Sequence, residues 1–238
     1  YEIYIAMKKT LYNLHQLPID YSFATSKNFD NFVAEGNEFL IDKLIEFSSS
    51  KPSNENIIML QGEKSSGKTH LCRAIKNHSN KKIIFVEYDS MKIIPHEQFD
   101  ILIIDNIDRL IVNSENEEYL FSLVNDFILN NKSILVTTTI SIEDIQFTLP
   151  DLKSRLRWDL IFKIKDLNDI NKIKVLEKFA SERGFKLTKK VSDYIMNNYR
   201  RDLFFLCNVI RAIDYSSLSE RRNITIPFVK KIMEYKKD

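Results

Sequence analysis

The stretch that most constrains this chain is residues 57–75, where an apolar run is followed by a short loop and then by a helical pattern. The loop reads GEKSSGKT and matches the Gly-x-x-x-x-Gly-Lys-[Ser/Thr] pattern of a phosphate-binding loop. Such a loop turns its backbone N–H groups toward a phosphate, while the lysine neutralises phosphate oxygens and the hydroxyl binds Mg²⁺. A chance match is the alternative, but the chain has only 4 glycines in 238 residues, and two of them fall at this spacing between a strand and a helix. We therefore assign nucleotide binding to Gly62, Glu63, Lys64, Ser65, Ser66, Gly67, Lys68 and Thr69.

A second part of the same site follows the apolar segment at residues 101–104. Asp105 ends this predicted strand, where an acid can hold Mg²⁺ through water and complete the charge neutralisation begun by Lys68 and Thr69. Without the phosphate loop, Asp105 would be interpreted as an ordinary turn residue. The next residue is Asn106, which cannot accept a proton from an attacking water, and Asp108 lies two positions further on. The expected cofactors are ADP or ATP with Mg²⁺, and the expected metal ligands are Thr69 and Asp105.

Composition narrows the class of protein. The chain is 44% hydrophobic and 29% charged, which is typical of a soluble globular protein, and its formal net charge of +2 gives no support for nucleic-acid binding over the whole surface. Cys72 and Cys207 fall inside apolar helical patterns and are interpreted as buried, reduced thiols. We find no apolar run of roughly 18 residues and no signal-peptide core, so a cytoplasmic protein without a membrane partner is expected.

Hydrophobic periodicity predicts an α/β fold. Apolar strands alternate with amphipathic helices, a pattern that favours a parallel sheet with helices on both faces. From residue 167 onward only helical patterns occur. The predicted strands lie at residues 57–60, 83–86, 101–105, 133–139 and 160–164, and the main predicted helices at 39–47, 70–75, 115–130, 167–184, 188–199, 202–218 and 226–235. The predicted units are an extended tail (1–27), an α/β nucleotide-binding domain (28–166) and a small helical domain (167–238).

Several segments resemble the DnaA/Hda family of AAA+ replication proteins. They are GKTHL at residues 67–71, FDNFV at 29–33, and LPDLKSRL at 149–156 with Trp158 just beyond. Three further segments resemble the Hda members more than the initiator itself, at residues 105–108, 183–185 and 224–230. The resemblance implies an AAA+ P-loop NTPase core with a five-stranded parallel sheet and a C-terminal α-helical lid. It also places Phe32 and Val33 beside the nucleotide.

The same resemblance assigns catalytic roles. Arg155 matches the arginine finger that this family offers to a nucleotide on a neighbouring subunit, where a guanidinium can bridge two phosphate oxygens; a surface salt bridge is the alternative. Trp158 is interpreted as a buried packing residue. The first sensor position falls on Thr139, which is otherwise an ordinary β-branched strand residue. The second falls on Phe204 instead of arginine, and Arg200 and Arg201, one turn earlier, are candidates to replace it or are simply solvated charges.

The N-terminal tail contains a candidate docking peptide. It resembles the motif by which Hda-type proteins bind the β sliding clamp of DNA polymerase III, with a glutamine to hydrogen-bond and apolar anchors for a preformed groove. The alternative is an arm that packs on its own domain. The peptide comprises Gln16, Leu17, Pro18, Ile19, Asp20 and Tyr21.

Two features separate the chain from the initiator. It ends shortly after the lid, without the helix-turn-helix domain that reads duplex DNA, and the connection at residues 88–99 is short for the insertion that engages single-stranded DNA. The expected partners are therefore the clamp and DnaA, with a homo-oligomer as a further option and DNA reached only through the clamp. The expected function is stimulation of ATP hydrolysis by DnaA, with little ATPase activity of its own. Rival functions are a DNA-handling AAA+ ATPase, such as a truncated initiator or helicase loader, and an inactive nucleotide-binding scaffold.

Overall fold

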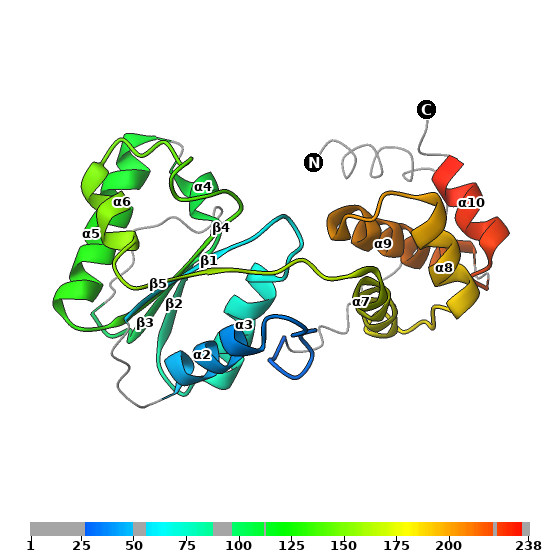
Figure 1. Ribbon diagram of the computed structural model, residues 1–238, viewed down its shortest axis with the longest axis horizontal. Helices are drawn as coiled ribbons and strands as arrows, with labels where there is room; N and C mark the ends of the chain where they lie inside the picture. Colours follow the sequence, from blue (N-terminus) through cyan, green and yellow to red (C-terminus); the bar gives the residue numbers. More distant parts are fainter. Residues whose placement is uncertain (1–26, 50–55, 88–96, 112, 221–222, 235–238) are drawn as a thin grey trace.

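The computed structural model describes residues 27–49, 56–87, 97–111, 113–220 and 223–234. It shows an α/β part and an all-helical part joined by the chain that follows the last strand (Figure 1). The predicted clamp peptide at residues 16–21 and most of the connection at 88–99 lie outside the described residues. Within the described ranges, no helix is both long and apolar enough to cross a membrane.

The sheet has five strands in the order β2-β3-β4-β1-β5, and every neighbouring pair is parallel. The strand that leads into the phosphate loop is therefore internal, between β4 and β5. The prediction of a five-stranded parallel sheet is confirmed. The strands are β1 (Ile57–Gln61), β2 (Ile83–Val86), β3 (Ile101–Ile104), β4 (Ser133–Thr138) and β5 (Leu160–Lys163).

Helices cover both faces of the sheet, because alternate strand residues point to opposite sides. On one side, Leu60 packs in a core with α2 (Glu38–Ser48) and α3 (Lys68–His78). On the other, Met59 packs in a core with α4 (Ile107–Leu110), α5 (Ser114–Leu129) and α6 (Pro150–Leu156). Figure 1 shows these three helices on one side of the sheet and α2 and α3 on the other. The short helices α4 and α6 were not predicted, because a helix of one or two turns has too few residues to show a period.

The C-terminal part contains four helices within the described residues. Each of them falls in one of the four helical ranges predicted from residue 167 onward. Its apolar stripes meet in a core of their own, which includes Leu176, Ile195, Leu206, Ile210 and Phe228. The helices are α7 (Asp169–Ser181), α8 (Lys189–Asn198), α9 (Leu203–Glu220) and α10 (Ile226–Glu234). They correspond to the helical lid that the sequence predicted.

The segment before α2 connects the two parts. Lys27 Nζ bonds Glu182 of the helical unit at 2.9 Å. The buried side chain of Asn37 bonds the backbone of Lys165 twice, accepting from its N–H at 2.8 Å and donating to its carbonyl at 3.3 Å. The carboxylate of Glu35 accepts a bond from the Asn171 side chain of α7. These contacts hold the segment between the sheet and α7.

Two residue-level expectations differ from the structure. Trp158 is 63% exposed, so its assignment as a buried packing residue is wrong. It lies two residues beyond the end of α6, and the apolar residues that α6 buries are Leu152 and Leu156 instead. Both cysteines are free, as expected, but only Cys72 is fully buried, while Cys207 is half-buried.

Candidate functional site

The phosphate loop is built by two glycines that no other residue could replace without strain or collision. Its first N–H, that of Gly62, donates to the Thr138 carbonyl of β4, which anchors the loop to the sheet. A Cβ on Gly62 would lie 2.6 Å from Ser66 Oγ, and a Cβ on Gly67 would lie 2.5 Å from Phe32 Cε2. Gly67 also has φ +100°, where side chains are rarely accommodated. The loop therefore wraps tightly and opens directly into α3.

Lys68 lies inside this loop. Its ammonium group donates to the carbonyls of Gly62 at 2.6 Å and Glu63 at 2.9 Å, and the side chain is 5% exposed. Burial lowers the pKa of Lys68, while the nearby carboxylates of Asp105 and Asp108 oppose that shift. An ammonium has three N–H donors, so one remains for a phosphate oxygen beside the two loop carbonyls in the described structure.

Asp105 and Thr69 meet at the carboxyl edge of the sheet. Thr69 Oγ1 donates to Asp105 Oδ2 at 2.7 Å, and Thr137 Oγ1 of β4 donates to Oδ1 at 2.6 Å. Thr137 is itself held by the backbone N–H of Asn106, at 2.8 Å. The structure thus brings together the two predicted metal ligands. Thr137 could not be predicted as part of the site, because a threonine inside a strand is ordinary.

The predicted sensor Thr139 lies next to Asp108. Its N–H donates to Asp108 Oδ1 at 3.1 Å, and its hydroxyl donates to the same carboxylate. Asn106 and Thr139 both line the cavity described below, and Asn106 adopts a left-handed backbone with φ +57°. The hydroxyl of Thr139 is therefore engaged by an acid of the same chain.

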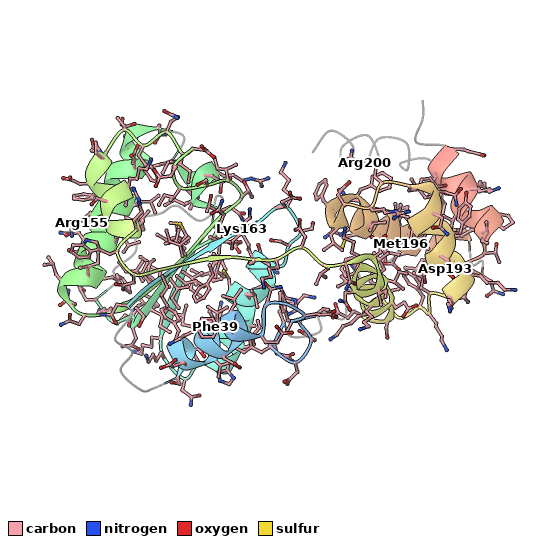
Figure 2. The ribbon with its side chains drawn as sticks, in the orientation of Figure 1. Phe39, Arg155, Lys163, Asp193, Met196 and Arg200 are labelled. Carbon is pink, nitrogen blue, oxygen red and sulfur yellow. The ribbon has the colours of Figure 1, made fainter. Side chains whose placement is uncertain are left out.

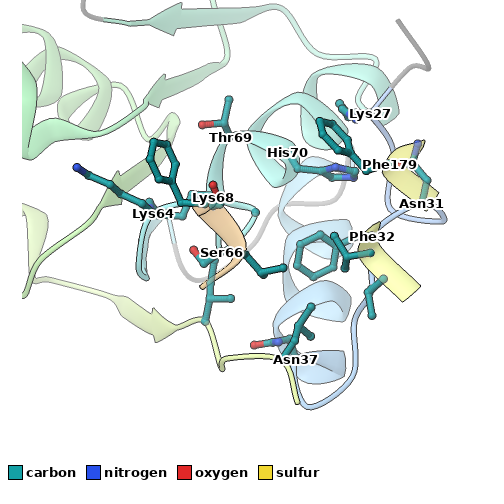
Figure 3. A pocket seen from close by; sticks show the side chains of 18 of the residues that line it. Lys27, Asn31, Phe32, Asn37, Lys64, Ser66, Lys68, Thr69, His70 and Phe179 are labelled. Atoms are coloured by element: carbon teal, nitrogen blue, oxygen red, sulfur yellow. The ribbon is translucent and has the colours of Figure 1, made fainter. Parts of the chain in front are cut away.

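A cavity of about 470 Å³ lies between the phosphate loop, the segment before α2 and the helical unit. Figure 3 shows Phe32, His70 and Phe179 on one side of it, and Lys64, Ser66 and Lys68 on the other. Val33 and Phe204 also line it, so most of the predicted nucleotide-binding residues face one space. Its charged lining consists of Lys27, Lys64, Lys68, Arg109, Lys165, Lys178 and Arg211 with Glu182.

The residues present fit a nucleoside phosphate and Mg²⁺. Seven cationic side chains against one carboxylate favour a polyanion, and the volume falls within the roughly 300–1,000 Å³ usual for ligand pockets. Ser66 Oγ is buried in the loop without a hydrogen-bond partner among the described residues. In the same ranges, no group of three or more His, Cys, Asp or Glu could hold a metal. A metal at Thr69 and Asp105 would therefore share its coordination with phosphate and water, as Mg²⁺ usually does.

Arg155 does not line this cavity. Figure 2 places it on the far side of the α/β part from the helical unit. Its guanidinium carbon lies 5.4 Å from the centre of the Phe121 ring, and it forms no ion pair with the described residues. Asp159, a candidate partner for a salt bridge, instead accepts the N–H groups of Asn56 and Ile57, both at 2.8 Å.

Phe204, which occupies the second sensor position in the lid, lines the cavity, whereas Arg200 and Arg201 do not. Phe204 is 46% exposed, and Lys64 Nζ lies 6.0 Å from its ring centre. Arg201 pairs with Asp169 at 2.6 Å and Arg200 with Asp202 at 3.0 Å. Arg211, two turns further along α9, was not predicted but does line the cavity.

This strand order, with a phosphate loop after β1, an acid after β3 and a C-terminal helical lid, defines the AAA+ class of P-loop NTPases. A family model described as the bacterial DnaA ATPase domain matches residues 23–163, and one described as the Hda lid domain matches residues 169–233. The chain belongs to the DnaA/Hda family.

Two similar proteins each span most of this chain. An uncharacterized protein of Haemophilus influenzae is 33% identical over 228 residues, which span 92% of this chain and 98% of that protein. Domain III of the Thermotoga maritima replication initiation protein DnaA superposes with a TM-score of 0.75 at 20% identity, covering 92% of this chain and 98% of that one.

Two further structures share the fold with lower TM-scores. AMPPCP-bound DnaA from Aquifex aeolicus gives a TM-score of 0.65 at 22% identity, over 79% of this chain and 65% of that one. The Thermotoga maritima RuvB Holliday junction branch migration motor gives 0.65 at 18% identity, over 88% and 72%. At these identities the structural likeness establishes the fold alone.

Proposed function

We propose that this protein is an Hda-type regulator that binds ADP or ATP with Mg²⁺, docks on the β sliding clamp and stimulates ATP hydrolysis by DnaA. The observation that carries the proposal is the separation of two features: a cationic cavity at the phosphate loop, and a half-buried Arg155 on another side of the same domain. In this arrangement residues 28–166 are the nucleotide-binding domain, 167–238 the lid and 1–27 the clamp-binding tail.

The cavity residues account for nucleotide binding. Backbone N–H groups of the loop and the ammonium of Lys68 would hold the phosphates, and Ser66 Oγ supplies a further buried hydroxyl. Phe32 and Val33 line the cavity on the N-terminal side, as expected for residues that contact the base. Thr69 and Asp105 would hold Mg²⁺, which when bound neutralises charge on the phosphates. AMPPCP in the Aquifex aeolicus DnaA structure is an adenine nucleotide analogue, which supports ADP or ATP here.

The same cavity is poorly equipped to hydrolyse its own nucleotide. A general base is missing at position 106, because the amide of Asn106 cannot accept a proton from water, and Thr139 already donates its hydroxyl to Asp108. The lid offers the apolar ring of Phe204 where the family places an arginine. We infer a protein that holds its nucleotide and turns it over slowly.

Arg155 is proposed to act on the nucleotide of DnaA. Water attacks the γ-phosphorus of ATP bound to DnaA, the bond to the β-phosphate oxygen breaks, and ADP and inorganic phosphate are released. A guanidinium from the neighbouring protein stabilises the charge that develops on the transferred phosphoryl group, an effect of about 10³–10⁵ in rate for arginine fingers in trans. Arg155 suits this role because its guanidinium forms no ion pair with the described residues and lies outside its own cavity.

The decisive experiment measures ADP formed per DnaA, using ATP-loaded DnaA, DNA-bound clamp and this protein. Arg155→Ala should abolish the stimulation and leave the fold and clamp binding intact. Arg157→Ala is the matched control, because Arg157 is an exposed arginine two residues away that is paired with Glu143 at 3.0 Å. Equal stimulation by the Arg155→Ala and parent proteins would make Arg155 an ordinary surface charge.

Clamp docking is tested separately on immobilised clamp. Replacing Gln16, Leu17 and Ile19 by alanine should abolish binding, while nucleotide affinity stays unchanged because the cavity is untouched. A variant that binds the clamp as well as the parent would make the tail an ordinary linker.

Nucleotide binding itself is tested by calorimetry on Lys68→Ala. Loss of the ammonium should weaken ADP and ATP binding by about 1.5–3 kcal/mol, the range of charge-assisted hydrogen bonds. An unchanged affinity would exclude the phosphate loop as the site. Salt-dependent DNA binding by the chain without clamp would instead favour the DNA-handling alternative.

A further inference from the structure

A buried acid on α5 fixes the start of the helix that carries Arg155. Glu117 is 2% exposed, and its two carboxylate oxygens each accept a backbone N–H: Oε1 from Leu149 at 2.7 Å and Oε2 from Thr148 at 3.0 Å. Leu149 is the N-cap of α6, and the next residue, Pro150, has no N–H. The carboxylate therefore satisfies the last two donors before the helix begins.

Helix α5 also supports the other end of α6. Phe121 lies one turn after Glu117, on the same side of the helix, and the guanidinium of Arg155 rests over its ring at 5.4 Å. The Phe121 ring is half-buried against the core that contains Leu152 and Leu156 of α6. One helix thus contacts α6 at its first turn through a carboxylate and at its last turn through an aromatic ring.

A buried carboxylate is costly unless its hydrogen bonds are satisfied, so its presence needs a reason beyond packing. Glu117 does not line the cavity, and no described contact links it to the phosphate loop. An arginine finger must be held close to the reactive geometry, because displacement by about 1 Å can cost on the order of 10²-fold in rate. A helix of seven residues depends on contacts with neighbouring elements for its orientation. Glu117 provides such a contact, because it holds the two backbone N–H groups just before α6.

We propose that Glu117 is a positioning residue for Arg155, and that Phe121 completes the support by orienting the guanidinium. The inference rests on the proposed function, because it assumes that Arg155 acts on the ATP of DnaA. We further infer that contacts from α5 hold Arg155 in the orientation needed for hydrolysis before DnaA binds. Glu117 then affects turnover without touching either nucleotide.

The main test is Glu117→Gln, with Glu118→Gln as control. Glutamine keeps the size but has one oxygen, so its NH₂ group faces one of the two backbone donors. Stimulated hydrolysis at saturating DnaA should fall at least tenfold, while the DnaA concentration for half-maximal stimulation, the nucleotide affinity and clamp binding stay within twofold. Glu118 is exposed on the same helix, and its substitution should change none of these.

A double mutant separates positioning from general loss of stability. If Glu117 acts by orienting the guanidinium of Arg155, Glu117→Gln should lower turnover less in an Arg155→Lys background, which keeps a point charge but no planar guanidinium, than in the parent protein. An equal fold loss in both backgrounds, or full activity of the single Glu117→Gln variant beside an inactive Arg155→Ala, would overturn the inference and leave the proposed function standing. Phe121→Leu, which keeps an apolar side chain, gives a second variant if Glu117→Gln fails to fold, and it should also lower turnover severalfold.

A readout without DnaA distinguishes the two failures. Trp158 is the only tryptophan of the chain, and its backbone N–H donates to the carbonyl of Arg155 at 3.3 Å, so its fluorescence anisotropy reports on the end of α6. Glu117→Gln should lower that anisotropy in the folded protein, whereas Glu118→Gln should not. If Arg155→Ala stimulates normally, the proposed function fails, and unchanged anisotropy in Glu117→Gln would separately refute positioning.

Discussion

Replacing Gly67 by alanine tests how the phosphate loop is built. Gly67 has φ +100°, and a Cβ there would lie 2.5 Å from Phe32 Cε2, against about 3.5–4.0 Å for normal carbon contacts. Gly184 provides the matched comparison, because it has φ +82° but no atom within 4 Å of its Cβ position. Alanine at Gly184 therefore costs backbone strain alone, and alanine at Gly67 costs strain plus a collision.

The expected magnitudes follow from these two terms. A left-handed backbone costs a non-glycine residue about 1–2 kcal/mol, and forcing an extra methyl group into packed surroundings costs about 1–3 kcal/mol more. Gly184→Ala should lower the free energy of unfolding by about 1–2 kcal/mol, and Gly67→Ala by about 2–5 kcal/mol. Because the collision pushes Phe32 and the loop apart at the cavity, Gly67→Ala should also weaken ADP binding by roughly tenfold or more, which is about 1.4 kcal/mol.

The assay is urea unfolding and ADP calorimetry on the parent protein and four variants: Gly67→Ala, Gly184→Ala, Phe32→Ala and the Gly67→Ala/Phe32→Ala double variant. Truncating Phe32 removes the ring that the new methyl group meets. In that background the added cost of Gly67→Ala should shrink to the value for Gly184→Ala, giving a favourable coupling energy. The reasoning is refuted if the two glycine positions cost the same in the parent protein, or if Phe32→Ala does not reduce the cost at Gly67.

Two smaller predictions concern individual side chains. Because Trp158 is 63% exposed, iodide should quench its fluorescence efficiently, and strong protection from quenching would contradict the exposure. For the same reason, Trp158→Ala should change the free energy of unfolding by no more than about 0.5 kcal/mol. Burial lowers the pKa of His70 in the folded protein. As the pH falls below about 6.5, His70 therefore binds a proton in the unfolded chain before it does in the folded protein, and the free energy of unfolding decreases. Urea unfolding of His70→Gln should show a smaller loss of stability between about pH 7.5 and 5 than the parent, and equal pH profiles would contradict this assignment.

The sheet and the phosphate loop could be predicted because each has a local sequence signal. A buried parallel strand is a continuous apolar run, and the loop pattern is fixed by backbone geometry that only glycine adopts at Gly67. Asp105 could be predicted for the same reason, since it ends such a run. The lid helices were recognisable from their apolar period.

Other parts of the site depend on distance in space, which the sequence does not contain. Thr137 holds Asp105 across 32 positions, and Glu117 reaches Leu149 across the same separation. Arg211 enters the cavity only because of how α9 crosses it. Trp158 was mispredicted because an aromatic residue beside an apolar strand is usually buried, whereas here the chain turns between α6 and β5 and leaves the ring in solvent.

A final prediction concerns the lid position of Phe204. The side chain lines the cavity from α9, and Nζ of Lys64 in the phosphate loop lies 6.0 Å from the centre of its ring. If this position faces the terminal phosphate, Phe204→Arg would add a guanidinium able to bind two phosphate oxygens. Without nucleotide, the new charge would stand near Lys64 and raise the repulsion within an already cationic cavity.

The variant should therefore bind ATP more tightly than the parent by about three- to tenfold, with a smaller gain for ADP, and the gain should shrink as salt is added. Phe204→Leu is the control, because it removes the aromatic ring without adding charge and should treat ATP and ADP alike. Calorimetry at two salt concentrations measures both effects. Equal changes for ATP and ADP in Phe204→Arg would mean that α9 presents this position to another part of the nucleotide, and the slow turnover we infer would then rest on Asn106 and Thr139 alone.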